Sequence, residues 1–294
     1  MKGLMWFRND LRMDDNPALR NACIEFEEVH AIYIFSSRQN NIHNEANCKI
    51  EFLIENLKIL DQELSKINIP LTIIDSTGFK DNKDIILNLI KERSINKVFW
   101  NNQFGNDEQN RDDNVTRSLK KNDIEFSSYH EKVIFSPGSI RTAEDKPYSV
   151  FTPFKKKWIE NFNLDLLDIE FKYLSKKKTL IESNVSDFKF KYKRNHSVDM
   201  SMWPPGEAHA KDRLELYLSK KILRYSQDRN DPIIDGTSRI SPYLALGILS
   251  PKRCILELTY ATHVFNPLLI RFSKANDIGG ACCEVETLCF FHHA

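Results

Sequence analysis

Three features are missing from this sequence of 294 residues, and each absence excludes a class of protein. No stretch approaches the roughly 18 apolar residues of a membrane-spanning helix, and the amino-terminal apolar run is too short for a signal peptide. None of the six cysteines belongs to a CxxC pair, so no standard metal-ligand spacing is present. We therefore expect a cytoplasmic, thiol-reduced protein with no metal site and no membrane contact.

A surplus of charge and a glycine-rich phosphate loop are also missing. Lysine and arginine number 42 and aspartate and glutamate 41, a net charge of +1 that indicates no polyanionic partner by itself. The turn that follows the first predicted strand, Arg8–Arg12, lacks the glycine triplet of a dinucleotide fingerprint, so we expect no NAD site. We interpret Arg8, Asp10 and Arg12 as a salt-bridged turn at the surface of the sheet edge.

Over residues 1–135, short apolar runs alternate with amphipathic segments. This alternation predicts an α/β domain with a doubly wound, Rossmann-like parallel sheet of five strands, covered by helices on both faces. The expected strands are Leu4–Phe7, Ala31–Phe35, Leu71–Ile74, Val98–Trp100 and Ile124–Phe126. The expected helices are Cys48–Lys66, Asp84–Arg93 and Asp107–Lys121.

The rest of the chain divides into three parts. Prolines and lysine runs predict an inter-domain linker over residues 136–205, with a short helix around Pro153–Phe162. Residues 206–257 then predict the start of an all-α domain, with helices at Glu207–Tyr225, Pro242–Leu246 and Pro251–Leu258. Residues 258–294 differ in composition and show no clear period, and we interpret this divergent tail as a frameshift or fusion scar.

A run of hydroxyl side chains with one arginine, Thr237–Ser241, precedes the second of these helices. Ser241 is the predicted N-cap, Pro242 suits the first helical position, and Gly247 is expected to end the helix. Backbone N–H groups, hydroxyls and a guanidinium at a helix start suit a phosphate or pyrophosphate. The run could instead be only an N-cap, but a cap needs no cation at the positive end of a helix.

Four motifs together resemble the DNA photolyase/cryptochrome family. They are Trp6–Arg12 with Asp15–Leu19, Gln103–Asp112, Tyr148–Phe154, and Gly236–Ser241 with Gly247–Pro251. The sequence resembles above all the bacterial cyclobutane-pyrimidine-dimer photolyases that have a folate antenna, in a truncated form. Electron-transfer flavoproteins, which are also parallel-sheet nucleotide binders, do not explain the third and fourth motifs together.

The resemblance implies two cofactors, FAD and a 5,10-methenyltetrahydrofolate antenna. By position in the motifs, the implied FAD contacts are Tyr225, Thr237, Ser238, Arg239, Ile240 and Ser241, and the implied antenna contacts are His43, Asp107 and Glu108. Asp107 departs from the family pattern, which often has asparagine there. Each set has a structural alternative: Tyr225 as a core residue, His43 as a loop histidine, and Asp107 and Glu108 as acidic residues in the first turn of a helix.

The implied activity is that of a deoxyribodipyrimidine photo-lyase, a carbon–carbon lyase that repairs UV-damaged DNA. In the family, light-driven electron transfer from reduced FAD splits pyrimidine dimers that are flipped out of the duplex. Catalytic residues of the family lie beyond the point of divergence, so none is assigned, and we expect weak or absent FAD binding, impaired activity and a monomer. The alternatives are a cryptochrome-like blue-light sensor, an antenna-binding module alone, or a non-functional gene remnant.

Overall fold

The computed structural model describes residues 1–167, 169, 171–192 and 198–261, and the chain forms two compact units. Unit 1 comprises Met1–Glu131, Phe171–Glu207 and Ala245–Ile248. Unit 2 comprises Lys132–Glu170, Ala208–Leu244 and the chain from Leu249 onward. The interpretation of the tail as a scar concerns residues that lie almost entirely outside the described ones.

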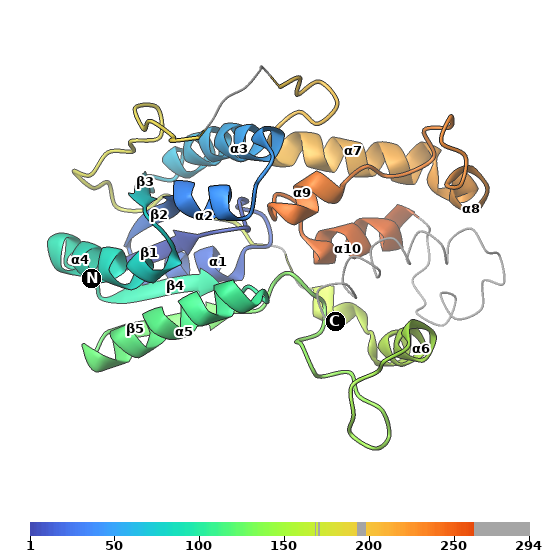
Figure 1. The fold of residues 1–294 in the computed structure, drawn as a ribbon, viewed down its shortest axis with the longest axis horizontal. Coiled ribbons are helices and arrows are strands. Elements are labelled where there is room, and N and C mark those ends of the chain that lie inside the picture. The colour runs from blue at the N-terminus through green and yellow to red at the C-terminus, as the bar shows by residue number, and fades with distance from the viewer. Residues whose placement is uncertain (168, 170, 193–197, 262–294) are drawn as a thin grey trace. The chain divides into compact units, whose positions relative to one another are not determined.

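Five parallel strands form the sheet of unit 1, as the apolar runs predicted (Figure 1). They are β1 (Lys2–Phe7), β2 (Glu28–Ser36), β3 (Leu71–Ser76), β4 (Lys97–Asn101) and β5 (Glu125–Tyr129). Their order across the sheet is β3-β2-β1-β4-β5, and every pairing is parallel. The chain reverses direction across the sheet between β1 and β4, and such a switch point is where open α/β sheets bind ligands.

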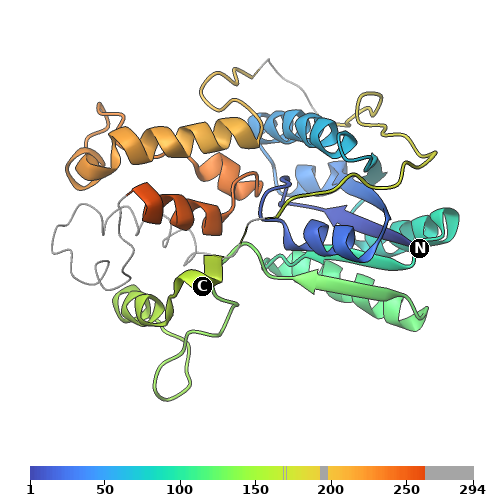
Figure 2. The same ribbon diagram turned by 180° about the vertical axis from the view of Figure 1, so that it is seen from behind.

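Helices cover both faces of this sheet (Figures 1 and 2). They are α1 (Pro17–Glu25) and α3 (Asn47–Ser65) on one face, and α4 (Asn82–Arg93) and α5 (Asn106–Lys121) on the other. Right-handed crossovers require the helices to lie on two faces, because the chain adds β2 and β3 on one side of β1 and then β4 and β5 on the other side. Side chains alternate along each strand, so Leu4 and Trp6 pack with α4 and α5, whereas Phe99 meets Phe26 edge to face on the side of α1.

The three helices predicted in this unit are confirmed within two residues, but two further helices were missed. α1 has nine residues, and its N-cap Asn16 accepts a hydrogen bond from the N–H of Leu19 at 3.1 Å, with Pro17 in the first position. α2 (Ser37–Ile42) has six residues and buries none of them, so it leaves no apolar periodicity in the sequence.

The turn after β1 is buried, so the prediction of a surface salt-bridged turn is wrong. Arg8, Asp10 and Arg12 are only 5%, 2% and 1% exposed. The carboxylate of Asp10 accepts from the N–H of Arg8 at 2.5 Å and from Nδ2 of Asn101 at 2.7 Å, and its negative charge raises the pKa of both arginines. The buried guanidinium groups also take carboxylate partners from distant parts of the chain.

Arg12 makes two contacts with distant parts of the chain. Its Nη2 lies 2.6 Å from Oε2 of Glu131, 119 residues further on, and its Nη1 donates to the carbonyl of Gly247 at 2.9 Å. Burial by itself would lower the pKa of Arg12, but Glu131 and Asp15 more than reverse this, and the pKa lies above its usual value. Gly247 has φ = +63° and ends its helix as predicted; a Cβ there would lie 2.7 Å from Cα of Asp10.

The segment predicted as an inter-domain linker, residues 136–205, belongs partly to each unit. Its second half lies along the outer edge of the sheet, where Asn184 accepts from the N–H of Ile73 at 2.7 Å and donates to its carbonyl at 3.0 Å. The hydroxyl of Tyr173 donates to the carbonyl of Met13 at 2.8 Å. Asn184 thus supplies hydrogen bonds that the edge strand β3 would otherwise leave open to another chain.

Unit 2 is helical in its described part. Its helices are α6 (Phe151–Asn161), α7 (Glu207–Lys220, whose first residue belongs to unit 1), α8 (Tyr225–Asp228), α9 (Ser241–Ala245, whose last residue belongs to unit 1) and α10 (Pro251–Ala261). The prediction of one continuous helix over Glu207–Tyr225 is wrong, because the chain turns after Lys220 so that Ile222 and Tyr225 pack with Leu258. Within the described residues, no helix combines the length and apolar character needed to cross a membrane.

We predict that Arg12→Met destabilises the chain by about 3–5 kcal/mol, because the buried carboxylate of Glu131 would lose its cation. Urea unfolding measures the change. The matched control is Glu25→Gln, which removes the partly exposed Lys97–Glu25 pair at 2.7 Å and should cost less than about 1 kcal/mol. Similar losses in the two variants would show that the Arg12 pair has no special structural role.

Candidate functional site

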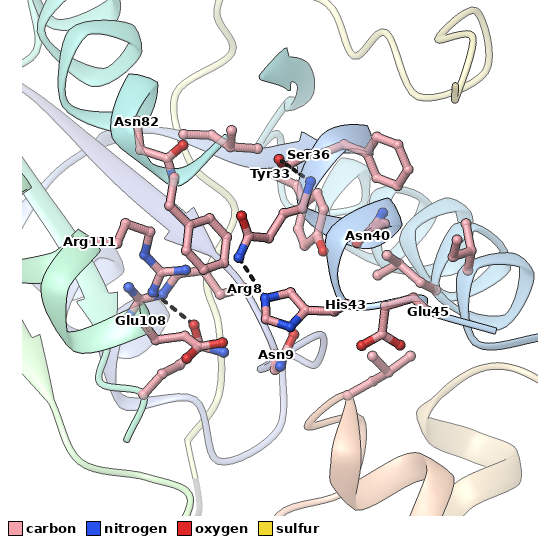
Figure 3. A pocket seen from close by; sticks show the side chains of 18 of the residues that line it. Arg8, Asn9, Tyr33, Ser36, Asn40, His43, Glu45, Asn82, Glu108 and Arg111 are labelled. Carbon is pink, nitrogen blue, oxygen red and sulfur yellow. Dashed lines mark hydrogen bonds between the residues drawn. The ribbon is translucent and has the colours of Figure 1, made fainter. Parts of the chain in front are cut away.

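A pocket of about 210 Å³ opens at the carboxyl ends of the strands of unit 1 (Figure 3). Arg8 and Asn9 follow β1, Ser36 ends β2, and Gln103 follows β4, so the pocket lies at the switch point of the sheet. Its aromatic lining residues are Trp6, Tyr33, Phe35 and Phe79. Ring surfaces combined with a few polar groups suit a planar heterocyclic ligand.

Helix α2 places His43 at this pocket. Ser36 caps the helix, with its Oγ accepting from the N–H of Gln39 at 3.3 Å. The ring Nε2 of His43 lies 2.6 Å from Nε2 of Gln39 and 3.6 Å from Oδ2 of Asp107. The second contact is an ion pair whenever the imidazole is protonated. The structure therefore brings His43 and Asp107 together, two residues that the family resemblance had named as antenna contacts.

Helix α5 presents Asp107 and Glu108 in its first turn, where acidic residues are also favoured without any ligand. Glu108 lines the pocket, and its carboxylate folds back over Gly105, where a Cβ would collide with it. Asp107 is mostly exposed and lines a neighbouring groove of about 580 Å³. His43 and Glu108 thus share one pocket, on opposite sides of it in Figure 3, and Asp107 joins them through His43.

Two buried arginines of the pocket wall were missed as site residues. Arg8 and Arg111 are each 5% exposed, and both bind Oδ1 of Asp112, at 2.6 and 2.8 Å. Burial, followed by the charge of Arg111, lowers the pKa of Arg8 to about 10. Arg8 also donates to the carbonyl of Asn101, while its Nε has no partner among the described residues. A buried donor without an acceptor is one that a ligand could satisfy.

A signal for Arg111 was present in the sequence. It lies three and four residues after Glu108 and Asp107, on the same face of a predicted helix. Arg111 donates to Oε1 of Gln103 at 2.8 Å, and its Cζ lies 4.9 Å from the ring centroid of Phe79. No comparable signal pointed to Tyr33, whose hydroxyl has a raised pKa chiefly because it is buried.

The predicted FAD-phosphate run lies in unit 2. Ser238 and Ile240 are buried, Thr237 is half-buried, and Ser241 is exposed. Arg239 has φ = +54°, and its Nε lies 2.8 Å from Oδ1 of Asp235. The pKa of Asp235 lies below its usual value, mainly because Lys221 donates a hydrogen bond to it at 2.6 Å, and also because of the charges of Lys221, Arg239 and Arg213. Several cations therefore face one carboxylate beside this run.

The start of the same run packs against the helix that contains Tyr225. A Cβ on Gly236 would lie 2.6 Å from Cβ of Asp228, the last residue of α8, so only glycine allows this close approach. Tyr225 is buried and meets Tyr217 edge to face, with ring centroids 6.2 Å apart. This buried position agrees with the alternative interpretation of Tyr225 as a core residue.

The helix start after the run differs by one residue from the prediction. The N–H groups of Tyr243 and Leu244 donate to the carbonyl of Ile240 at 3.0 and 3.1 Å, so Ile240 rather than Ser241 is the N-cap. The left-handed conformation of Arg239, which the sequence does not reveal, turns the chain one residue earlier. The predicted start of the next helix, α10, is confirmed. Oγ of Ser250, directly before Pro251, accepts from the N–H of Arg253 at 3.0 Å.

Comparison with known proteins identifies the family of this chain. The model of the DNA photolyase family matches residues 3–172. The deoxyribodipyrimidine photo-lyases of Buchnera aphidicola (subspecies Acyrthosiphon pisum) and Escherichia coli are 33% and 32% identical over 258 and 256 residues. Each alignment covers 87% of this chain and 53% of the relative, so the chain spans about half the length of these curated relatives.

Solved structures agree with this assignment. A bacterial class III photolyase from Agrobacterium tumefaciens superposes with a TM-score of 0.78 and 26% identity, over 99% of this chain and 58% of that one. A cryptochrome from Synechocystis superposes with a TM-score of 0.74 over 99% of this chain and 60% of that one, at 20% identity, and so supports the fold alone. With a family match over more than half of its residues and the predicted five-stranded sheet in place, the chain belongs to the DNA photolyase family.

Proposed function

We propose that unit 1 is the light-harvesting part of a photolyase-type DNA repair enzyme, and that its pocket binds the folate antenna 5,10-methenyltetrahydrofolate. One observation supports this more than any other: Glu108 from α5 and His43 from the end of α2 line the same pocket at the switch point of the sheet. Both were named as antenna residues by the family resemblance, from segments 65 residues apart in the chain.

The pocket lining suits a pteridine ring. A carboxylate such as that of Glu108 can accept hydrogen bonds from the ring's amino and N–H groups, in the charge-assisted geometry that is among the strongest in proteins. The side chains of Tyr33 and Phe79 provide apolar faces, and Asn40 and Gln103 provide amide groups for the remaining ring atoms. The unpartnered Nε of Arg8 adds a buried donor to the same wall.

The proposed reaction of the complete enzyme is the splitting of pyrimidine dimers in UV-damaged DNA by light-driven electron transfer. Reduced FAD supplies the electron when bound, and the protein positions the cofactor and excludes competing reactions. In the described chain, Arg239 and the cations that face Asp235 would hold the FAD pyrophosphate, beside Thr237, Ser238, Ile240 and Ser241. We further propose a cytoplasmic monomer.

The antenna assignment predicts that Glu108→Gln weakens folate binding about tenfold, because a charge-assisted hydrogen bond becomes a neutral one. Titration of the purified chain with methenyltetrahydrofolate, followed by its near-ultraviolet absorbance, measures the affinity. Glu92→Gln is the matched control, because Glu92 is an exposed carboxylate on α4 that does not line the pocket. Equal affinities in the two variants would contradict the role of Glu108.

The same titration distinguishes folate from flavin as the occupant. An archaeal photolyase from Sulfolobus tokodaii, which superposes with a TM-score of 0.64, was solved with two FAD molecules, which implied a novel light-harvesting cofactor in that protein. When FAD is added to the present chain with methenyltetrahydrofolate bound, we expect the folate to stay in the pocket. Displacement of folate by FAD in a manner that depends on Glu108 would show that a flavin is the antenna.

The flavin assignment predicts that FAD binds more tightly than riboflavin, and that Arg239→Gln reduces this advantage about tenfold by removing a cation from the pyrophosphate site. Equilibrium dialysis of both ligands measures the difference even when binding is weak. Lys220→Gln, which removes an exposed charge at the end of α7, is the control. A chain that shows no preference for FAD over riboflavin would argue against the pyrophosphate site.

A further inference from the structure

Trp6 occupies an unusual electrostatic position in the pocket wall. The indole is 1% exposed, and two guanidinium groups from distant parts of the chain lie over its ring. Cζ of Arg8 is 4.6 Å and Cζ of Arg111 is 5.0 Å from the ring centroid. All three residues line the pocket. The two cations share the carboxylate of Asp112, and the charge of Asp10 also acts on Arg8, but the groups that lie over the indole itself are the two guanidinium cations.

A tryptophan beside a light-absorbing ligand is a potential route of energy loss. Indole is among the most easily oxidised side chains, and an excited heterocycle close to it can act as a one-electron oxidant. In that step one electron passes from the indole of Trp6 to the excited ligand, which leaves an indole radical cation and breaks no bond. The excitation then ends in charge recombination and is no longer available for transfer to another chromophore.

The surroundings of Trp6 would favour such a loss if the ring were unprotected. Trp100 lies edge to face with Trp6 at a centroid distance of 6.1 Å, and Phe126 stacks on Trp100 at 5.3 Å. A positive charge formed on Trp6 could therefore spread to a second indole, away from the pocket. Two nearby cations oppose this, because a radical cation in a buried, weakly screened site is repelled by each of them.

We propose that Arg8 and Arg111 keep Trp6 in its reduced state while the pocket ligand is excited, so that light energy is not lost to electron transfer from the indole. The inference rests on the proposed antenna function of the pocket. It assigns the arginines a role beyond the contact proposed between Arg8 and the ligand, because both act through the charge that they place next to Trp6. Asp112 contributes by holding both guanidinium groups in place.

The test is the fluorescence lifetime of methenyltetrahydrofolate bound at saturation to the full chain. Arg111→Gln should shorten the lifetime by about threefold, because one positive charge close to the indole is lost. Arg111→Lys keeps the charge and should leave the lifetime close to that of the parent chain. Arg8→Gln should shorten it in the same direction, and serves as a second variant if Arg111→Gln does not fold.

Replacement of the electron donor provides the decisive control. In a Trp6→Phe background, Arg111→Gln should no longer change the lifetime, because phenylalanine is much harder to oxidise than tryptophan. A shortening that persists in this background, or an unchanged lifetime in both Arg111→Gln and Arg8→Gln with ligand bound, would overturn the inference alone. Absence of bound folate in the parent chain would overturn the proposed function and this inference together.

Discussion

The pairing of two buried arginines with distant carboxylates holds unit 1 together around its pocket. Arg8 and Arg12 follow the central strand β1, and burial leaves neither of them able to stay charged at low cost without an anion. Asp112 of α5 neutralises the first, and Glu131, which follows β5, neutralises the second. These two contacts tie the carboxyl end of β1 to α5 and to the segment after β5, the two elements that follow β4 in the chain.

The same contacts determine the electrostatics of the pocket. Arg8 cannot leave the wall without uncovering Asp112, and Asp112 in turn holds Arg111 over Trp6. Two guanidinium groups held by Asp112 therefore belong to the pocket wall, and Glu108 supplies a further carboxylate to the same pocket. A structural requirement, the neutralisation of buried charge, thus also places charged groups at the site. The motif after β1 therefore contributes to the stability of unit 1 through the ion pairs of Arg8 and Arg12, and to the pocket through Arg8.

Much of the architecture of unit 1 could be predicted, because it follows from local patterns. The five strands were recognisable as apolar runs, and the long helix α3 shows its buried face at helical spacing. Helix α2 was missed because a six-residue helix with no buried side chain has no such pattern. The hydrogen bonds of Asn184 along β3 were equally invisible, since they join residues 111 positions apart within a segment that has the composition of a linker.

For the candidate site, the sequence by itself determined the order of the motifs, and the family resemblance suggested His43 and Glu108 as antenna contacts. Their presence in one pocket was decided by the tertiary structure, because only the parallel sheet brings the ends of its strands to a common edge. Tertiary structure also decided the partners of Arg8 and Arg12. The choice of a counter-ion for a buried charge depends on distance in space, and at 104 and 119 residues along the chain no local pattern reports it.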